Sequence, residues 1–381
     1  MTKVLHVCGD YANQNIYNNL ITSIDDKQIE QLVYVPVRAE SQLNKNVNPN
    51  LKLTSFFFIK NLVKIDRILF KKKINKLVKD LQNHLTHKIN DFDLIHAHFL
   101  FSDGGVAYEL FKKNKTPYIV AVRNTDINFF FKYFFFLRSY GIEILLNASK
   151  IIFISPAYKT TLINKYVPQL HQKLIEQKCE IIPNGIDPFW LKNSMQKTFI
   201  KKQEYSFLYV GDFSKNKNVE STIKALKIIK NKGYKIKFNI VGGGGNNTSK
   251  IIEIANKEND WITIYNRIND KNLLLSHYRV NDIFIMPSIY ETFGVVYIEA
   301  LSQGLPVIYT KGQGIDGFFE ENTVGVSVNP LDVNSIVNKI EWLIENADSI
   351  STKSEKILPS FDWEVISYTY QNLYNTASHN N

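Results

Sequence analysis

Cysteine is almost absent from this chain, with only Cys8 and Cys179 among 381 residues. Both lie in apolar, strand-like runs without a neighbouring cysteine, which excludes a disulfide framework and predicts reduced core thiols in a cytoplasmic protein. Long apolar runs are also absent. The longest candidate, residues 129–137, is interrupted by Lys132 and is far shorter than the roughly 20 residues of a transmembrane helix. The apolar start, residues 4–8, is too short for the core of a signal peptide.

Glycine-rich and metal-binding patterns are scarce as well. A dinucleotide fingerprint needs G-x-G-x-x-G after the first strand, and only Gly9 is present there, which argues against a nicotinamide enzyme. No cluster of histidine and cysteine has the spacing of metal ligands, so we expect no metal site. The composition, 44% apolar and 22% charged, is typical of a globular protein, and the length predicts two or three domains.

Short apolar runs alternate with helical stretches along the whole chain, a pattern that favours doubly wound parallel sheets. The first half has five such runs, at residues 2–8, 93–98, 117–122, 150–155 and 179–183. The second half has six, at residues 205–210, 236–241, 262–265, 282–286, 306–310 and 324–328. The sequence therefore predicts an α/β protein of two Rossmann-like domains that face each other across a cleft. Ligands of such domains bind at the carboxyl ends of the strands.

The most informative stretch is residues 287–307, PSIYETFGVVYIEALSQGLPV. It follows a buried strand and turns into a helix that begins near Gly294 and stops at Gly304. Free backbone N–H groups at the start of a helix form a natural seat for phosphate. Two carboxylates flank that seat, because Glu291 lies in the turn and Glu299 lies eight residues further on, within the helix.

The order Glu-Thr-Phe-Gly, then Glu299-Ala, then Gly-x-Pro-Val resembles the signature of the family-four retaining glycosyltransferases, which have the GT-B fold. The resemblance implies that Glu291 contacts the donor sugar and that Glu299 holds the ribose hydroxyls. It also implies that the backbone of the turn binds the sugar and the diphosphate, through Thr292, Phe293, Gly294 and Val295. Residues 182–187, IPNGID, resemble the interdomain signature of the same family.

The resemblance suggests domain bounds. We expect an acceptor-side domain over residues 1–187, a polar, lysine-rich linker over 188–204, and a donor domain over 205–360. In GT-B proteins a final helix crosses back onto the first domain, and residues 361–378 would form it here. The loop after the first strand then lies on the acceptor side, with Gly9, Asn13 and Asn15 as candidate contacts.

A second family pattern, Gly-Arg-Leu-x-x-x-Lys, clamps the donor diphosphate. Gly211 and Lys217 match it, but Asp212 stands where arginine is expected. A carboxylate cannot replace a phosphate clamp, so Asp212 either turns away or has another purpose, and Arg267 is a candidate substitute cation. Gly242 opens a run of four glycines at a strand end, where the main chain can approach a nucleotide closely.

In the first domain the family pattern His-Gly-x-Asp is matched only at Asp126. Arg123 replaces the histidine, and its guanidinium could neutralise a phosphate of donor or acceptor. His96 and His98 lie on a predicted strand, and we expect them to face opposite ways. His98, nearer the strand end, is then the site candidate, with a hydrogen-bonded structural role as the alternative.

The net charge of +10 suggests an anionic partner, although a well-solvated surface gives the same balance. Residues 60–79 carry eight basic side chains against one acidic side chain, on an apolar stripe whose register slips near Phe70. We therefore expect a bent helix or two helices. It could be an ordinary Rossmann helix with a solvated lysine face. With the phenylalanines at 56–58, 129–131 and 134–136, it could instead form a membrane interface.

Together these features predict a metal-independent, retaining hexosyltransferase without a bound cofactor. Its donor would be a UDP- or GDP-linked sugar, and its acceptor a lipid-linked oligosaccharide of bacterial surface polysaccharide, such as capsule or O-antigen. We expect it in the cytoplasm, with peripheral membrane contact through the basic first domain. The alternatives are a nucleotide-sugar epimerase or hydrolase of the same fold, and an inactive nucleotide-binding protein. Nucleic acid is not an expected partner, because no reader motif is present.

Overall fold

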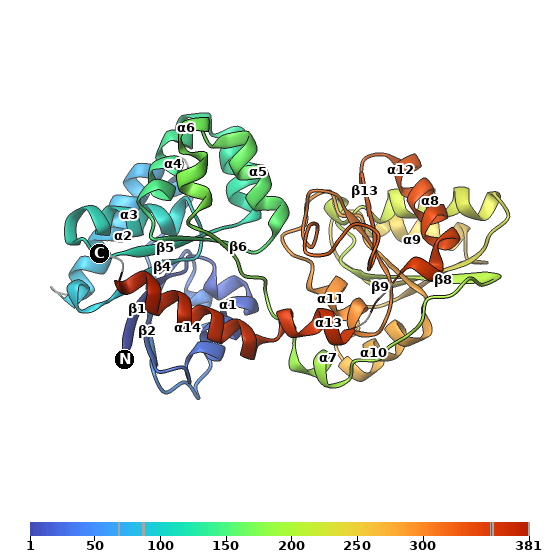
Figure 1. Ribbon diagram of the computed structural model, residues 1–381, viewed down its shortest axis with the longest axis horizontal. Coiled ribbons are helices and arrows are strands. Elements are labelled where there is room, and N and C mark those ends of the chain that lie inside the picture. Colours follow the sequence, from blue (N-terminus) through green and yellow to red (C-terminus); the bar gives the residue numbers. More distant parts are fainter. Residues whose placement is uncertain (68, 86–87, 351, 353, 380–381) are drawn as a thin grey trace. The chain divides into compact units, whose positions relative to one another are not determined.

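A computed structural model describes residues 1–67, 69–85, 88–350, 352 and 354–379 of the chain (Figure 1). The chain divides into two compact units. Unit 1 comprises Met1–Ile154, Tyr158–Asn184 and the C-terminal Trp363–Asn381, and unit 2 comprises Ser155–Ala157 and Gly185–Asp362. Each unit is built around one parallel sheet.

Unit 1 contains a seven-stranded sheet with the order β3-β2-β1-β4-β5-β6-β7, and all neighbouring strands are parallel. The strands are β1 Thr2–Val7, β2 Ile29–Val37, β3 Thr54–Lys60, β4 Leu94–Ala97, β5 Tyr118–Val122, β6 Lys150–Phe153 and β7 Cys179–Ile181. The helices connecting them are α1 Asn15–Ile24, α2 Phe70–Leu85, α3 Ser102–Asn114, α4 Arg138–Asn147, α5 Pro156–Tyr166 and α6 Gln169–Glu176. Helices cover both faces of such a sheet, and accordingly every residue of β4 and β5 is buried.

Two of these strands, β2 and β3, were not predicted from the sequence. The phenylalanines of β3 were considered for a membrane interface, but they pack internally. Phe56 and Phe58 lie against the buried cluster that contains Tyr11 and Val33, and Phe57 stacks on His84 of α2. The basic segment is also shorter as a helix than expected, because β3 extends to Lys60. It is divided into a 3-10 turn at Lys64–Arg67 and α2, a break that agrees with the predicted slip near Phe70.

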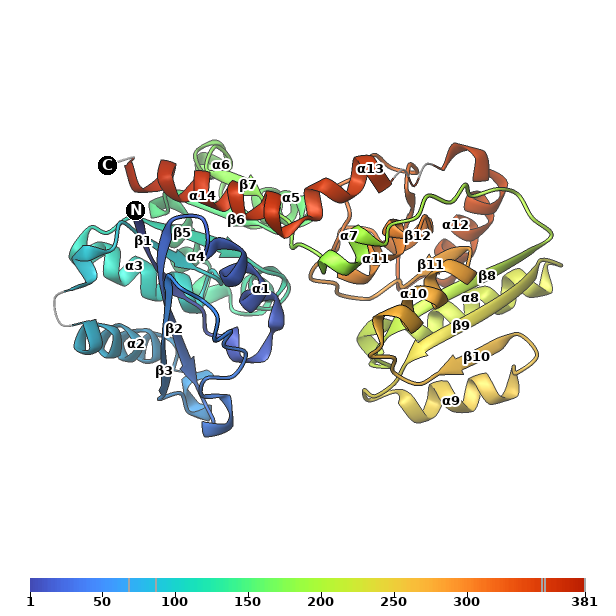
Figure 2. The same ribbon diagram turned by 90° about the horizontal axis from the view of Figure 1, so that it is seen from below.

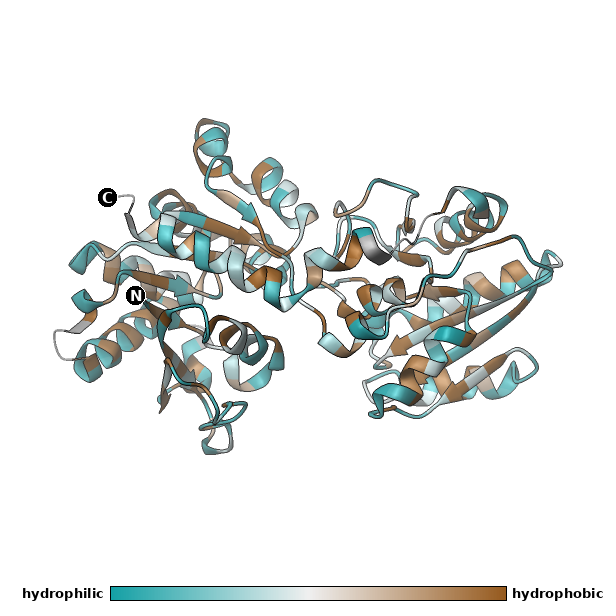
Figure 3. Cartoon of the chain, turned by 60° about the horizontal axis from the view of Figure 1, so that its bottom comes forward, coloured by the Kyte–Doolittle hydropathy of each residue, from teal (hydrophilic) through white to brown (hydrophobic). Residues whose placement is uncertain are grey.

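The last helix, α14 Trp363–His379, belongs to unit 1 and runs beside α1 (Figures 1 and 2). Its apolar side contributes to the core on one face of the sheet, through Trp363, Ile366, Tyr370, Leu373, Tyr374 and Ala377. The opposing residues include Val4 of β1 and Leu94 of β4. Figure 3 shows apolar residues recurring along the strands and on one side of the helices, the pattern by which each unit covers its sheet.

Unit 2 contains a six-stranded parallel sheet with the order β10-β9-β8-β11-β12-β13. Its strands are β8 Glu204–Gly211, β9 Lys235–Gly242, β10 Ile262–Tyr265, β11 Ile283–Ile285, β12 Val307–Thr310 and β13 Gly325–Val328. Its helices are α7 Pro188–Lys192, α8 Val219–Asn231, α9 Thr248–Lys257, α10 Lys271–Val280, α11 Val295–Ser302, α12 Val333–Glu345 and α13 Ser354–Ile357. The strand order reverses between β8 and β11, and ligands of doubly wound sheets bind at this switch point.

The two sheets confirm the predicted fold class of two Rossmann-like, doubly wound parallel-sheet units. The segment expected to be a linker is partly structured, because it contains α7. The N-cap of this helix is Asp187, whose carboxylate accepts a hydrogen bond from Phe189 N. Within the part of the chain that the structure describes, no helix has both the length and the apolar character needed to cross a bilayer.

Candidate functional site

The loop between β11 and α11 places a glycine at the start of the helix. Gly294 has φ +79°, a left-handed conformation that side chains rarely adopt, and it is the N-cap of α11. A Cβ atom at this position would lie 2.4 Å from the ring of Tyr297. The preceding Phe293 is buried against Phe318 and Phe361, so that this part of the loop is anchored by its side chain. The predicted strand, turn and helix are all present here.

Two asparagines join this loop to the one that follows β8. The side chain of Asn216 accepts a hydrogen bond from Tyr290 N (3.0 Å) and donates one to Tyr290 O (2.8 Å). Asn218 has φ +58° and donates from Nδ2 to Pro287 O at 3.0 Å. Both loops lie at the carboxyl ends of adjacent strands, β8 and β11, and these hydrogen bonds hold them as one unit.

That arrangement brings Lys217 and Glu291 together. Lys217 Nζ lies 2.7 Å from Glu291 Oε2, and the glutamate side chain is only 10% exposed. Ser288 Oγ donates to the same oxygen at 3.2 Å, and Thr292 N donates to Oε1 at 3.1 Å. The carboxylate is thus fixed by a cation, a hydroxyl and an amide, next to the start of α11. The sequence placed both residues in the site but gave no sign that they form an ion pair.

A cavity of about 400 Å³ lies at the carboxyl ends of β8 and β9, beside α11. It is lined by Val210, Gly211, Asp212, Val241, Gly242, Gly243, Arg267, Ile268, Asn269, Leu274, Val296 and Glu299. The structure therefore gathers four predicted donor-binding residues, Gly211, Gly242, Arg267 and Glu299, from four different segments. A Cβ atom on Gly242 would lie 1.8 Å from Gly211 O, so only glycine allows the two strand ends to approach so closely.

Glu299, which lines this cavity, has a buried tyrosine as its hydrogen-bonding partner. Tyr278 OH donates to Glu299 Oε2 at 3.0 Å, and Trp190 packs edge-on against Tyr278 with ring centroids 5.2 Å apart. Burial raises the pKa of Glu299 to about 7, against an ordinary value of 4.5. At neutral pH the group is divided between its acid and its carboxylate, and both forms can hydrogen-bond to hydroxyl groups. Tyr278 is a site residue that sequence reasoning missed.

Asp212 has a structural partner that accounts for its position. Its Oδ1 accepts a hydrogen bond from Ser214 N at 2.8 Å, and its carbonyl accepts one from Tyr209 OH at 2.6 Å. The side chain thus shapes the loop that carries Lys217. Arg267 is the only cationic residue among the twelve that line the cavity, and it is exposed and forms no ion pair within the described residues.

The predicted residues of unit 1 lie at the carboxyl ends of β4 and β5. Asp126 is buried, and its carboxylate accepts hydrogen bonds from the backbone N–H groups of Leu100, Phe101 and Arg123 at 2.9–3.3 Å. Burial raises the pKa of Asp126 to about 6. Arg123 is 6% exposed, and its Nε donates to His98 O at 3.1 Å. These contacts tie the two strand ends together.

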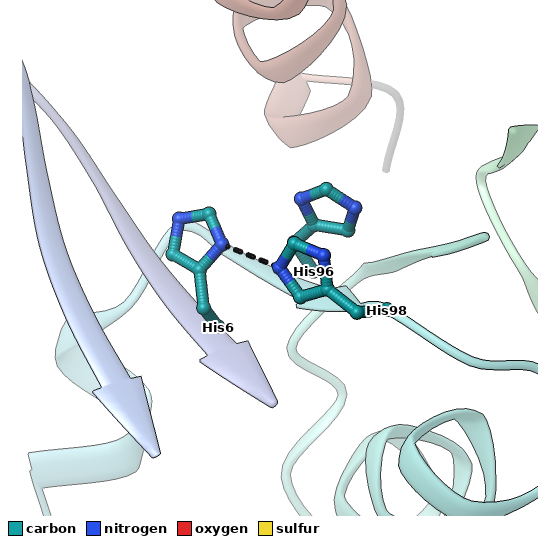
Figure 4. A group of neighbouring side chains, drawn as sticks. All are labelled: His6, His96 and His98. Carbon is teal, nitrogen blue, oxygen red and sulfur yellow. Dashed lines mark hydrogen bonds between the residues drawn. The ribbon is translucent and has the colours of Figure 1, made fainter. Parts of the chain in front are cut away.

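Three histidines form a buried cluster under these strand ends (Figure 4). The expectation that His96 and His98 face opposite ways is wrong, because residues two apart on a strand share one face. Their rings stack with centroids 4.0 Å apart, and His6 of β1 joins them. His6 Nδ1 and His98 Nε2 are 3.0 Å apart, and His96 Nδ1 is 2.8 Å from Tyr374 OH of α14. His98 is therefore fully buried in the interior of unit 1.

The ligand atoms of His6, His96 and His98 all lie within 4.8 Å of one another, a spacing that could hold a metal ion. Burial lowers the pKa of His6 to about 3 and those of His96 and His98 well below the ordinary value. The charge of Arg123 acts in the same direction on the two latter rings. The positive charge of Arg123 opposes a bound metal ion, and the absence of a metal site stays a prediction.

The expected acceptor-side loop follows β1. Gly9 N donates to Asp103 Oδ2 at 3.2 Å, Asn13 is exposed and donates to Asp10 Oδ1 at 2.7 Å, and the exposed Asn15 begins α1. Asp103 is buried at the start of α3, and burial raises its pKa to about 7. The sequence did not single out Asp103, whose only signal is its position just after a strand.

Comparison with known proteins adds to this geometry. Residues 192–357 match the family model "Glycosyl transferases group 1", and residues 19–189 match the model "Glycosyltransferase Family 4". With two Rossmann-like sheets and the site at the β8–β11 switch point, these matches define a glycosyltransferase of the GT-B fold. The chain belongs to the family-four type of these enzymes, as the sequence motifs indicated.

Two relatives are of interest. The chain is 27% identical over 261 residues to the capsular polysaccharide biosynthesis glycosyltransferase CapM of Staphylococcus aureus. The matched region covers 65% of this chain and 66% of the relative. It is 23% identical over 283 residues to the alpha-monoglucosyldiacylglycerol synthase of Acholeplasma laidlawii, covering 69% of each.

Two solved structures have the same fold over nearly the whole chain. Sucrose-phosphate synthase from Thermosynechococcus elongatus has a TM-score of 0.73 at 21% identity, covering 99% of both chains. Anabaena HepE in complex with UDP and glucose has a TM-score of 0.65 at 16% identity, covering 99% of this chain and 100% of the other. At these identities the likeness establishes the fold.

Proposed function

We propose that the protein transfers a sugar, with retention at the anomeric carbon, from a UDP-linked donor to an acceptor hydroxyl. The observation that carries this proposal is the joint position of the cavity and the Lys217–Glu291 ion pair at the β8–β11 switch point. The cavity is lined by Arg267 and by the carboxyl of Glu299, whose pKa is raised by burial, and these groups suit a nucleoside. The ion pair lies where a diphosphate and its sugar would follow, at the amino end of α11.

Each group has a definite task in this scheme. Glu299 hydrogen-bonds the ribose hydroxyls, and Arg267 adds positive charge at the rim of the cavity. Lys217 and the first amides of α11 receive the diphosphate, and they stabilise the negative charge that develops as the bond to the anomeric carbon breaks. Once Lys217 turns to phosphate, Glu291 is released to hydrogen-bond the sugar. Lysine and helix amides supply this stabilisation without a metal ion.

Retention places a constraint on the acceptor. No protein nucleophile is singled out near Glu291, so the acceptor oxygen attacks the cation-like anomeric carbon from the face that the diphosphate leaves. The C–O bond to phosphate breaks as the new C–O bond forms, and the hydroxyl proton passes to a phosphate oxygen. We assign the acceptor to unit 1, whose strand ends carry Arg123 and the loop of Gly9, Asn13 and Asn15.

The names of the similar proteins support the choice of substrates. Anabaena HepE was solved with UDP and glucose, which favours a uridine nucleotide over GDP. CapM takes part in capsular polysaccharide synthesis, and the Acholeplasma enzyme makes a glycosylated diacylglycerol. We therefore propose a lipid-borne acceptor in bacterial surface polysaccharide synthesis, at the cytoplasmic face of the cell membrane.

One observation favours a second candidate, a nucleotide-binding protein without transferase activity. Asp212 occupies the position where the family has a phosphate-binding arginine, and its carboxylate is committed to the loop. The other alternative is a nucleotide-sugar epimerase or hydrolase of this fold. An assay with the donor alone tests for it, because either enzyme would change or release the sugar without an acceptor.

The test combines binding with turnover. A thermal-shift screen with UDP, GDP and their sugars should raise the melting temperature with uridine nucleotides, since a ligand of the native state stabilises it. Glu299→Ala should abolish that shift, whereas Glu291→Ala should keep it and lose release of UDP in the presence of lipid-linked acceptors. Glu341→Ala, which removes a surface carboxylate paired with Lys232, is the matched control. Binding without turnover on any acceptor would favour the inactive protein.

A further inference from the structure

An aromatic segment of unit 1 projects into solvent just after β5. It begins with a π-helical turn, Asp126–Phe131, and continues to a 3-10 turn, Phe135–Leu137. Four of its rings are largely exposed: Phe129 (47%), Tyr133 (57%), Phe135 (73%) and Phe136 (65%). We call these four residues the aromatic patch. Soluble monomers seldom expose contiguous apolar surface of this kind without a partner.

The aromatic patch is held in place by rings below it. Phe130 stacks on the buried Phe101 with centroids 4.8 Å apart, and Phe134 packs against both Phe129 (5.2 Å) and Phe136 (5.7 Å). The exposed rings are therefore attached to the core of the unit through a chain of aromatic contacts.

Positive charge accompanies the aromatic patch. Lys132 lies within it, and α2 begins at Phe70, whose ring centroid is 6.1 Å from that of Phe130. The first turn of α2 carries the exposed Lys71 and Lys72, and the segment before α2 carries three exposed apolar residues, Val63, Ile65 and Leu69. The single acidic residue of residues 60–79, Asp66, is buried and accepts a hydrogen bond from Val63 N.

We propose that the aromatic patch, with Lys132, Lys71 and Lys72, docks on a bilayer that contains anionic phospholipid. Aromatic rings partition to the depth of the headgroups, and lysines beside them meet lipid phosphates, so the surface matches both layers of a membrane interface. A second copy of the chain fits less well, because a twofold interface would set these lysines against their own equivalents. The inference rests on the proposed lipid-borne acceptor, and it adds the surface that brings the enzyme to it.

The test measures binding of the full chain to vesicles by cosedimentation, with phosphatidylcholine alone or mixed with phosphatidylglycerol. We expect binding only to the mixed vesicles. Phe135→Ser with Phe136→Ser should weaken it at least about tenfold, and Lys71→Gln with Lys72→Gln should weaken it about fivefold for each lysine. Leu170→Ser, at an 87% exposed leucine of α6, and Lys112→Gln with Lys113→Gln on α3 are matched controls that should bind like the wild type.

A second measurement reports insertion directly. Phe136→Trp should shift its emission to shorter wavelength with mixed vesicles and stay unchanged with phosphatidylcholine. Failure of the wild-type chain to bind mixed vesicles, or unchanged binding of both double variants, would overturn the inference. So would dissociation of a lipid-free dimer by the Phe135/Phe136 variant, because the patch would then be a protein interface. Neither measurement needs catalysis, so thermal shifts with UDP-sugars test the proposed function independently.

Discussion

The pKa of Glu299 makes nucleotide binding depend on pH, and Tyr278 sets where the change falls. The carboxylate accepts hydrogen bonds from two ribose hydroxyls better than the acid does, so affinity for UDP should rise as pH increases through about 7. Tyr278 OH donates to the same carboxylate at 3.0 Å and stabilises its charged form. Tyr278→Phe removes that hydrogen bond, which leaves the carboxyl easier to protonate.

The size of the effect follows from the strength of such a bond. A hydrogen bond to a charged group contributes about 1.5–3 kcal/mol. One pKa unit corresponds to about 1.4 kcal/mol, so the pKa of Glu299 should rise by about one to two units in Tyr278→Phe. At neutral pH the variant should then bind UDP about tenfold more weakly, with wild-type affinity recovered at a pH about one to two units higher.

Isothermal titration with UDP between about pH 6 and pH 9 measures both curves. Tyr234→Phe, at a partly exposed tyrosine of unit 2 outside the cavity, is the control for loss of a phenol group. A merely structural role of Tyr278 would lower affinity equally at every pH. Affinity that is independent of pH in the wild type, or a Tyr278→Phe curve parallel to it, would refute the reasoning.

Three further predictions concern other parts of the chain. Lys217→Ala should lower turnover about a hundredfold or more, because it removes a cation from the leaving diphosphate and breaks the ion pair with Glu291, whereas Lys217→Arg should retain part of the activity in a UDP-release assay. Gly294→Ala should lower the melting temperature and abolish UDP binding, since its Cβ would meet the ring of Tyr297. Gly312→Ala, at a positive-φ glycine with open space around it, should show backbone strain alone. The buried histidines stay neutral in the native state but are protonated in the unfolded chain. Stability should therefore fall as pH drops below about 6.5, His96→Gln should weaken that dependence, and elemental analysis should find no stoichiometric zinc.

Local sequence patterns predicted much of the fold. The apolar run at 282–286 became β11, Ile283–Ile285, and the glycine before the next apolar stripe became the N-cap of α11. Strand β2 was missed because Pro36 and polar residues interrupt its apolar run. Strand β3 was missed because a run of phenylalanines fits an exposed surface and a sheet equally well, and only contact with Tyr11 and Val33 decides between them.

The site shows where sequence reasoning stops. Short motifs located Glu291, Glu299 and Lys217, because each lies in a recognisable turn or helix. Their partners come from distant segments, as when Tyr278 meets Glu299 or His6 meets His98, ninety-two residues away. Such pairs depend on strand order, which a single sequence leaves open. The same holds for Asp212, whose substitution became intelligible once Ser214 N was seen to bind it.

The course of the chain through its two units has a consequence for biosynthesis. Apart from Ser155–Ala157, unit 2 is continuous from Gly185 to Asp362, whereas unit 1 needs Trp363 and the rest of α14, which are synthesised after unit 2. Unit 1 therefore lacks part of the cover on one face of its sheet until α14 has been synthesised, whereas unit 2 can already fold. A stop codon near residue 362 would remove only a short segment, yet Val4, Leu94 and their neighbours would lose their contacts with α14. The exposed apolar surface would make such a fragment a substrate for chaperones and proteases.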